Sequence, residues 1–127
     1  MNTISLKEKE KQALQNFILE LEARYCEHPR VLLIGSKARG DSTPESDIDV
    51  LVILPREEPQ IRRNVLTIAS RVSLDFDVLL NPIVIGESRL QRQLDFSFYR
   101  NITPEAKEMV IKDGEIDFIS GIMDAIV

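Results

Sequence analysis

The feature that most constrains the fold of this chain is a stretch of eight residues, Asp47–Leu54, in which two aspartates lead into an unbroken apolar run. A short run of branched residues is typical of a strand buried within a sheet. Because side chains alternate between the faces of a strand, Asp47 and Asp49 point to one face, about 6–7 Å apart. Ile48 and Val50 point to the other face, into the core. The pattern therefore predicts a strand that presents two carboxylates where it begins.

The residues before this strand predict a helix and a first strand. Apolar residues recur at helical spacing within Ser5–Glu27, and Ser5 and Glu8 have the spacing of a capping box. Arg30–Ile34 is rich in branched residues and predicts a short buried strand. This strand ends at Gly35-Ser36, where we expect a turn or the start of a helix, followed by a loop.

The residues after it predict a second helix and a third strand. Helical spacing of apolar residues continues from Ile61 to Val72, after a turn bounded by prolines. The pattern then changes to alternation over Leu74–Leu80, which predicts a strand. Asp75 and Asp77 would share the face of this strand that the apolar residues leave free, so a third carboxylate is available.

The C-terminal third is less regular. A short helix is expected at about Glu87–Leu94, the structure of Thr103–Ile111 is left open, and Ile116–Val127 has near-helical apolar spacing. The order helix, strand, loop, strand, helix, strand predicts an α/β (α+β) fold, with a small mixed β-sheet of three to four strands and helices packed on it.

Length and composition narrow the class of protein. The 127 residues suit a single domain spanning 1–127, and an apolar fraction of 43% with 29% charged residues is that of an ordinary globular protein. No apolar run approaches the ~20 residues needed to cross a membrane, and the N-terminus lacks a signal-peptide pattern. We therefore expect a cytoplasmic protein that does not contact membranes. The net charge of −5 disfavours direct nucleic-acid binding.

Cysteine and histidine are too scarce for most metal and nucleophile chemistry. Cys26 is the single cysteine and His28 the single histidine, which excludes an intramolecular disulfide and a zinc site of these ligands. We expect both residues to lie at a helix end without a chemical role. Any metal ion must be held by oxygen.

Gly35 and Ser36 have the residue types of a phosphate-binding turn. Glycine lets the backbone approach phosphate oxygens, and the Ser36 hydroxyl and the N–H groups of a helix start donate to them. Lys37 and Arg39 follow at once and are expected to meet the β and γ phosphates, Arg39 through two parallel hydrogen bonds. Alone, a Gly-Ser after a strand is more often a simple turn, and an Asp-x-Asp on a strand is about as often a solvated face, so it is their conjunction that favours a nucleotide site.

Carboxylates on rigid strands favour Mg²⁺, a cation that prefers oxygen ligands. Two such ions, about 3.5–4 Å apart, stabilise both the attacking and the leaving oxygen of a phosphoryl substitution. The sequence therefore predicts nucleotide chemistry that depends on two Mg²⁺ ions.

These motifs resemble a known signature. Gly35–Gly40, followed by Ser46–Val52, resembles the Gly-Ser, ten residues, Asp-x-Asp pattern of minimal nucleotidyltransferases in the DNA polymerase β-like superfamily. Asp77–Leu80 resembles the later strand of that family, which carries a third acid, and Ser97–Ile102 resembles a segment near the end of these domains. The resemblance covers about residues 30–102 and implies the nucleotidyltransferase fold.

The resemblance also implies roles for individual residues. In this superfamily the first two aspartates bind both metal ions, while the third binds one of them and helps to deprotonate the acceptor hydroxyl. Carried over, the catalytic and metal-binding residues are Asp47, Asp49 and Asp77. Asp75 is an alternative third acid, because it would share the face of Asp77. The nucleotide-binding positions are then Gly35, Ser36, Lys37 and Arg39.

The chain further resembles the antitoxin of HEPN/MNT toxin–antitoxin pairs, whose members transfer AMP from ATP to a tyrosine of the HEPN ribonuclease toxin and silence it. Superfamily members that modify antibiotics or tRNA add a domain that binds the acceptor, for which 127 residues leave no room. We therefore expect ATP as the substrate and a HEPN-type toxin as the protein partner. The apolar residues of about 103–127 are expected to dock the toxin or a second copy of the chain, or else to cover the protein's own core.

Two other functions stay open. The chain could neutralise a toxin by binding alone, as a non-catalytic antitoxin, or it could be a stand-alone nucleotidyltransferase that acts on a small molecule. The intact set of acids favours catalysis over pure binding. The lack of an acceptor domain counts against a small-molecule substrate.

Overall fold

The computed structural model describes residues 4, 6–25, 29–43, 45–93, 100 and 104–120. The elements in chain order are α1 (Glu8–Arg24), β1 (Arg30–Ile34), α2 (Gly35–Arg39), β2 (Ile48–Leu54), α3 (Pro59–Phe76), β3 (Leu80–Gly86), α4 (Glu87–Gln93), β4 (Lys107–Lys112) and β5 (Glu115–Ser120). These strands form one mixed sheet in the order β3-β2-β1-β4-β5. β2 and β3 are parallel and joined through α3, and every other neighbouring pair is antiparallel. The predicted fold class is confirmed, with five strands among the described residues in place of three or four.

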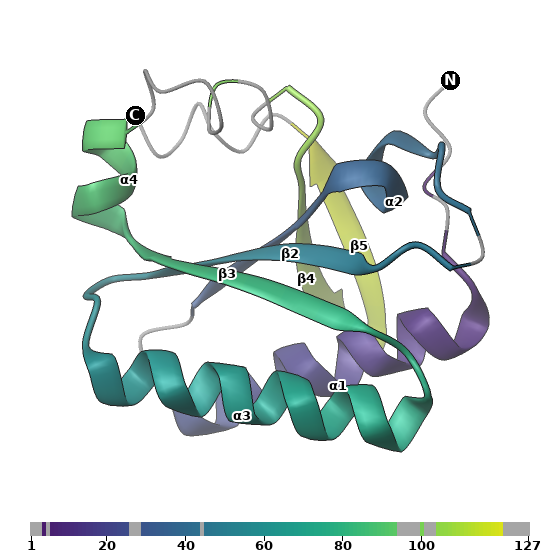
Figure 1. The fold of residues 1–127 in the computed structure, drawn as a ribbon, viewed down its shortest axis with the longest axis horizontal. Helices are drawn as coiled ribbons and strands as arrows, with labels where there is room; N and C mark the ends of the chain where they lie inside the picture. Colours follow the sequence, from purple (N-terminus) through teal and green to yellow (C-terminus); the bar gives the residue numbers. More distant parts are fainter. Residues whose placement is uncertain are drawn as a thin grey trace.

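Two long helices cover one face of the sheet. α1 and α3 lie side by side beneath it in the view of Figure 1. The main buried cluster joins these helices to the strand side chains that point toward them, among them Leu14, Phe17, Val31, Leu33, Val50, Val52, Val65 and Ile68. No helix in the described part of the chain is long and apolar enough to cross a membrane.

The other face of the sheet carries a smaller buried cluster. It joins side chains of β1, β2 and β3 to Leu90 of α4, and its members include Leu32, Ile34, Leu51, Ile53 and Ile85. β1 and β2 are therefore buried on both faces. This explains why their sequences are continuous apolar runs instead of alternating patterns.

The start of α1 differs from the sequence prediction. The helix begins at Glu8, and Glu10 Oε1 accepts a hydrogen bond from the backbone N–H of Lys7 at 2.8 Å. Glu10 therefore supplies the carboxylate that satisfies an open donor at the helix start. The predicted capping box of Ser5 with Glu8 is wrong, since Glu8 is the first residue of the helix, and Ser5 itself lies outside the described residues.

The predicted strand over Leu74–Leu80 is wrong. α3 continues through Phe76, which lies four residues after the buried Val72 and packs against the main core. The apparent alternation was thus the last turn of a helical stripe, because positions four apart lie on one helix face. Leu74, expected to face the core, is 83% exposed.

α3 ends at Phe76, and the next residue, Asp77, has a left-handed conformation, with φ of 54°, that breaks the helix. The Ser73 hydroxyl accepts a hydrogen bond from the backbone N–H of Leu80 at 3.0 Å, which connects the helix end to the start of β3. The third strand therefore begins where the prediction had it end. Pro82 lies within β3 and is tolerated there because β3 is at the edge of the sheet. The short helix expected at about Glu87–Leu94 is confirmed as α4, and Leu94 lies outside the described residues.

The C-terminal helix expected over Ile116–Val127 is wrong within the described residues, where β4 and β5 form an antiparallel hairpin. Asp113 and Gly114 join the strands, both with positive φ, as in the tight turn that an Asp-Gly pair favours. Ile116 and Phe118 pack against the main core, so this part of the segment covers the protein's own interior. Residues 121–127 lie outside the described part of the chain.

The exposure of Leu74, which follows from the observed boundary between α3 and β3, can be tested by comparing its truncation with that of the buried Leu14 in α1. Leu14→Ala removes a fully buried side chain and should lower the free energy of unfolding by about 2–5 kcal/mol. Leu74→Ala should change it by less than about 0.5 kcal/mol, because this side chain lies outside the core. Urea unfolding of both variants measures the difference. Similar losses of unfolding free energy for the two variants would show that Leu74 is buried, as the predicted strand over Leu74–Leu80 requires.

Candidate active site

The two aspartates of the Asp-x-Asp motif lie at the start of β2. Asp47 is exposed and immediately precedes the strand, while Asp49 is its second residue and is half-buried. Ile48 and Val50 are buried in the cluster with α1 and α3. Alternation therefore places Asp49 on the sheet face away from the two long helices. The predicted strand and its buried face are confirmed.

Gly35 lies directly against the carboxylate of Asp49. Ile34 pairs with Asp49 in the antiparallel ladder of β1 and β2, so the chain leaves β1 beside this acid. Gly35 has φ of +73°, and a Cβ added to it would lie 2.7 Å from Asp49 Oδ2, closer than real Cβ atoms approach their neighbours. Glycine is thus required twice, for the backbone conformation and for the space that the carboxylate occupies. α2 begins here, with Ser36 half-buried in its first turn.

Asn81 is a site residue that sequence reasoning missed. It pairs with Asp49 in the parallel ladder of β2 and β3, and its Nδ2 donates a hydrogen bond to Asp49 Oδ1 at 3.0 Å. The alternation over Leu74–Leu80 had placed the third strand too early, so Asn81 fell beyond it. A strand that includes Pro82, assigned to a sheet edge, would have brought Asn81 opposite the motif.

The predicted third acid does not join the pair. Asp75 lies in α3, and Asp77 has a fully exposed side chain whose Oδ2 lies 3.5 Å from Lys9 Nζ. Asp77 lines the same cavity as Ser46, so it lies at the end of the sheet where the Asp-x-Asp motif begins. Within the described residues, however, no three acidic, histidine or cysteine side chains come together as a metal site. The expected shared strand face of Asp75 and Asp77 is wrong, because neither residue is on a strand.

Lys37 is buried, contrary to its predicted contact with phosphates. Its Nζ lies 2.9 Å from Glu10 Oε2, and the two side chains are 2% and 6% exposed. The short helix α2 turns Lys37 and Ala38 inward, toward α1 and the core. A buried ammonium needs a carboxylate partner, and Glu10 supplies it. Lys37 therefore connects α2 to α1. It points away from the face of the sheet on which the Asp49 carboxylate lies.

Arg39 is exposed, and two acids hold it. Its guanidinium bonds Asp41 Oδ2 at 3.2 Å and Glu105 Oε2 at 3.2 Å. Hydrogen bonds to Asp41 and then to Glu105 raise the pKa of Arg39, so the side chain stays charged. Glu105 precedes β4, and Arg39 thus connects the end of α2 to the C-terminal part of the sheet. A phosphate at Arg39 must compete with these two carboxylates.

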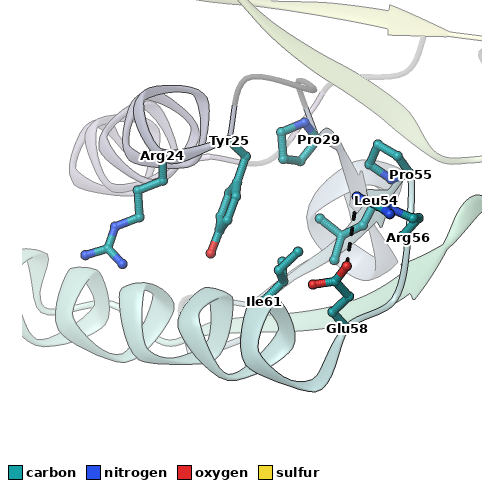
Figure 2. A pocket seen from close by; sticks show the side chains of 8 residues that line it. All are labelled: Arg24, Tyr25, Pro29, Leu54, Pro55, Arg56, Glu58 and Ile61. Carbon is teal, nitrogen blue, oxygen red and sulfur yellow. Dashed lines mark ion pairs between the residues drawn. The ribbon is translucent and has the colours of Figure 1, made fainter.

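A second cavity, of about 230 Å³, lies at the far end of β2. Figure 2 shows it between the end of α1 and the turn after β2, with Tyr25 pointing toward α3 and the ion pair of Arg56 with Glu58 at its rim. Leu54 lines it, about 17 Å along the strand from Asp49. The Tyr25 hydroxyl is buried there without a hydrogen-bond partner in the described residues. Among the described residues that line this cavity, Glu58 is the one acid, so they do not provide the paired carboxylates expected of this nucleotide site.

The motif and its geometry agree with a match to a known family. The family described as "Nucleotidyltransferase domain" matches residues 14–117, a range that includes the Gly35 turn, both aspartates and β3. The chain belongs to this nucleotidyltransferase family. It is accordingly a nucleotidyltransferase enzyme, with a nucleoside triphosphate as its substrate.

Two proteins of Methanocaldococcus jannaschii are similar to this nucleotidyltransferase. One, named "Putative protein adenylyltransferase MJ0604", is 31% identical over 99 residues, which cover 77% of this chain and 95% of the relative. The other, named "Putative protein adenylyltransferase MJ0141", is 47% identical over 57 residues, 43% of this chain and 57% of the relative. No solved structure matches the nucleotidyltransferase significantly.

The residues of the site fit a divalent cation. Asp47 and Asp49 offer carboxylate oxygens at the start of one strand, and neither is fully buried. Mg²⁺ prefers oxygen ligands and is usually held by one or two carboxylates, with water and substrate phosphates completing its coordination. A pair of acids therefore suffices for a nucleotide-bound Mg²⁺, and a third carboxylate is not required.

A pair of glycine substitutions isolates the contact between Gly35 and Asp49. Gly35 and Gly114 both have positive φ, but an added Cβ meets nothing within 4 Å at Gly114. Either change to alanine should cost about 1–2 kcal/mol in backbone strain. Gly35→Ala should also displace the Asp49 carboxylate and reduce nucleotidyl transfer at least tenfold, whereas Gly114→Ala should keep full activity. Equal activity of the two refolded variants would contradict this role of Gly35.

Substitutions in the ion pair of Lys37 with Glu10 test whether Lys37 has a structural role or binds phosphate. Lys37→Met leaves a buried carboxylate unpaired and should lower the free energy of unfolding by about 3–5 kcal/mol. Lys37→Met combined with Glu10→Leu should recover part of this loss, because neither charge then remains although the hydrogen bond from the Lys7 N–H to Glu10 is lost. Urea unfolding of the two single variants and the double variant gives the coupling energy. A stable Lys37→Met with weakened ATP binding would instead support the phosphate contact.

Proposed function

We propose that this nucleotidyltransferase transfers AMP from ATP to a tyrosine hydroxyl of a partner HEPN ribonuclease toxin and so neutralises it, in a reaction that depends on Mg²⁺. The observation that carries the proposal is the Asp49 carboxylate at the start of β2, with Asp47 two residues before it and Gly35 packed against it. The names of both relatives, which refer to protein adenylyltransferases, support a protein as the acceptor.

In the proposed reaction the acceptor oxygen forms a bond to the α-phosphorus of ATP, and the bond to the leaving pyrophosphate breaks. The hydroxyl proton is released to solvent or to a nearby base. When bound by Asp47 and Asp49, Mg²⁺ neutralises charge on the triphosphate. The backbone N–H groups that follow Gly35 and the Ser36 hydroxyl donate hydrogen bonds to phosphate oxygens. Catalysis then comes from positioning and charge neutralisation, without a covalent enzyme intermediate.

The proposal assigns metal binding to two acids. Asp77, with its exposed carboxylate beside Lys9, lies outside the pair. The acceptor hydroxyl therefore has no third carboxylate of the described residues to remove its proton. A tyrosine hydroxyl suits such a site, because its pKa of about 10 makes it a far better proton donor than an aliphatic alcohol.

Mass spectrometry of the toxin tests the proposed reaction. Purified chain is incubated with Mg²⁺, ATP and the HEPN toxin, and each AMP added raises the mass of the toxin. Asp47→Asn should reduce the rate at least a hundredfold, because it removes a charged ligand of the cation. Asp117→Asn makes the same chemical change on the exposed edge strand β5 and should leave the rate unchanged.

The outcomes also separate the two rival functions. Unmodified toxin that both wild type and Asp47→Asn nevertheless bind and neutralise would identify a non-catalytic antitoxin. Transfer of AMP to a small molecule in the absence of any protein acceptor would identify a stand-alone nucleotidyltransferase. Modified toxin with equal rates for wild type and Asp47→Asn would contradict the assignment of the site.

A further inference from the structure

We infer that Asn81 is a positioning residue that fixes the orientation of the Asp49 carboxylate. Its amide occupies a position beside Asp49 at which a carboxylate would instead increase the affinity for a cation. This inference rests on the proposed binding of a divalent cation at Asp47 and Asp49. It concerns a residue that none of the sequence motifs contains.

Both oxygens of Asp49 have a defined neighbour. Oδ2 lies against Gly35, so close that a Cβ there would be 2.7 Å away, and Oδ1 accepts the hydrogen bond from Asn81 at 3.0 Å. A carboxylate with one free oxygen rotates readily about its last torsion angle. The hydrogen bond from β3 and the close approach of Gly35, the first residue of α2, therefore restrict this carboxylate to one orientation.

The backbone of Asn81 is itself restrained. Asn81 pairs with Asp49 in the ladder, and the next residue, Pro82, pairs with Val50. A residue before proline is confined to extended conformations, because the proline ring clashes with the helical one. The Asn-Pro sequence therefore keeps Asn81 extended at the point where its side chain must reach Asp49.

An amide and a carboxylate at position 81 would act differently. The amide of Asn81 donates to Asp49, so the acid keeps its orientation before any cation is present. A carboxylate there would face Asp49 with a like charge and would favour a cation between the two. Asparagine thus gives a site that is oriented in advance but binds its cation with less charge.

The contact between the two side chains can be tested without any activity measurement. In ¹⁵N–¹H spectra of the full chain, the side-chain amide signals of Asn81 are those missing from Asn81→Asp. Asp49→Ala should shift these signals, because it removes their acceptor, and should leave those of Asn64 in α3 in place. Asn81 signals that do not move in Asp49→Ala would overturn the inference.

The effect on the cation is measured with Mn²⁺, which accepts the same oxygen ligands as Mg²⁺ and can be followed by its free-ion EPR signal. Asn81→Ala should weaken Mn²⁺ binding about three- to tenfold, the effect of one lost hydrogen bond. Asn81→Asp should tighten it at least fivefold. Asn64→Ala removes the same group from α3 and should leave the affinity unchanged. The gain in Asn81→Asp is the decisive result, because a misfolded variant cannot produce it.

The outcomes distinguish this inference from the proposed function. Mn²⁺ binding that Asp47→Asn abolishes, with equal affinities for wild type, Asn81→Ala and Asn81→Asp, would overturn the role of Asn81 and leave the proposed cation site standing. Wild type that binds Mn²⁺ no better than Asp47→Asn would overturn both.

Discussion

The antiparallel pairing of β1 with β2 is the constraint on which the rest of the site depends. It places the last residue of β1, Ile34, opposite Asp49, so the turn that follows β1 must begin beside that carboxylate. This explains why the turn begins with Gly35, the residue type that leaves room for the acid. β3 then approaches from the other side of β2 and brings Asn81 to the remaining oxygen. Three neighbouring strands thus converge on one side chain, and the helices α1 and α3 stabilise the sheet from the opposite face.

The distribution of positive charge near the site follows from the same arrangement. Of the two cations that come directly after Ser36, Lys37 is committed to Glu10 inside the protein, and Arg39 lies between two acids at the surface. Neither is a free counter-charge for a triphosphate that carries about four negative charges. In the proposed reaction, neutralisation comes mainly from divalent cations held by Asp47 and Asp49 and from N–H donors of the turn.

The sequence was a good guide wherever short-range pattern and burial agree. Arg30–Ile34 and the strand after Asp47 are buried on both faces, and their apolar runs are too short to be helices. The end of α3 could not be predicted in this way, because Val72 and Phe76 satisfy a helical stripe while Phe76 also fits an alternating strand. The same error concealed Asn81. The burial of Lys37 depends on Glu10, which is distant in the sequence, and no local pattern reports such a contact. The Asp113-Gly114 turn was visible in the sequence and outweighs the near-helical spacing that follows it.

The buried pair of Lys37 and Glu10 has a consequence for how this protein can change over evolutionary time. The turn beside Asp49 and the first turn of α1 are joined by two opposite charges that water does not reach. Loss of one charge leaves the other stranded, so a single substitution at either position is selected against even if the nucleotide never touches it. Homologous chains should therefore carry both charges or neither, and a homologue with a neutral residue at one position should have compensated at the other. The lysine that follows Gly35-Ser36 is then inherited together with a glutamate that no motif includes.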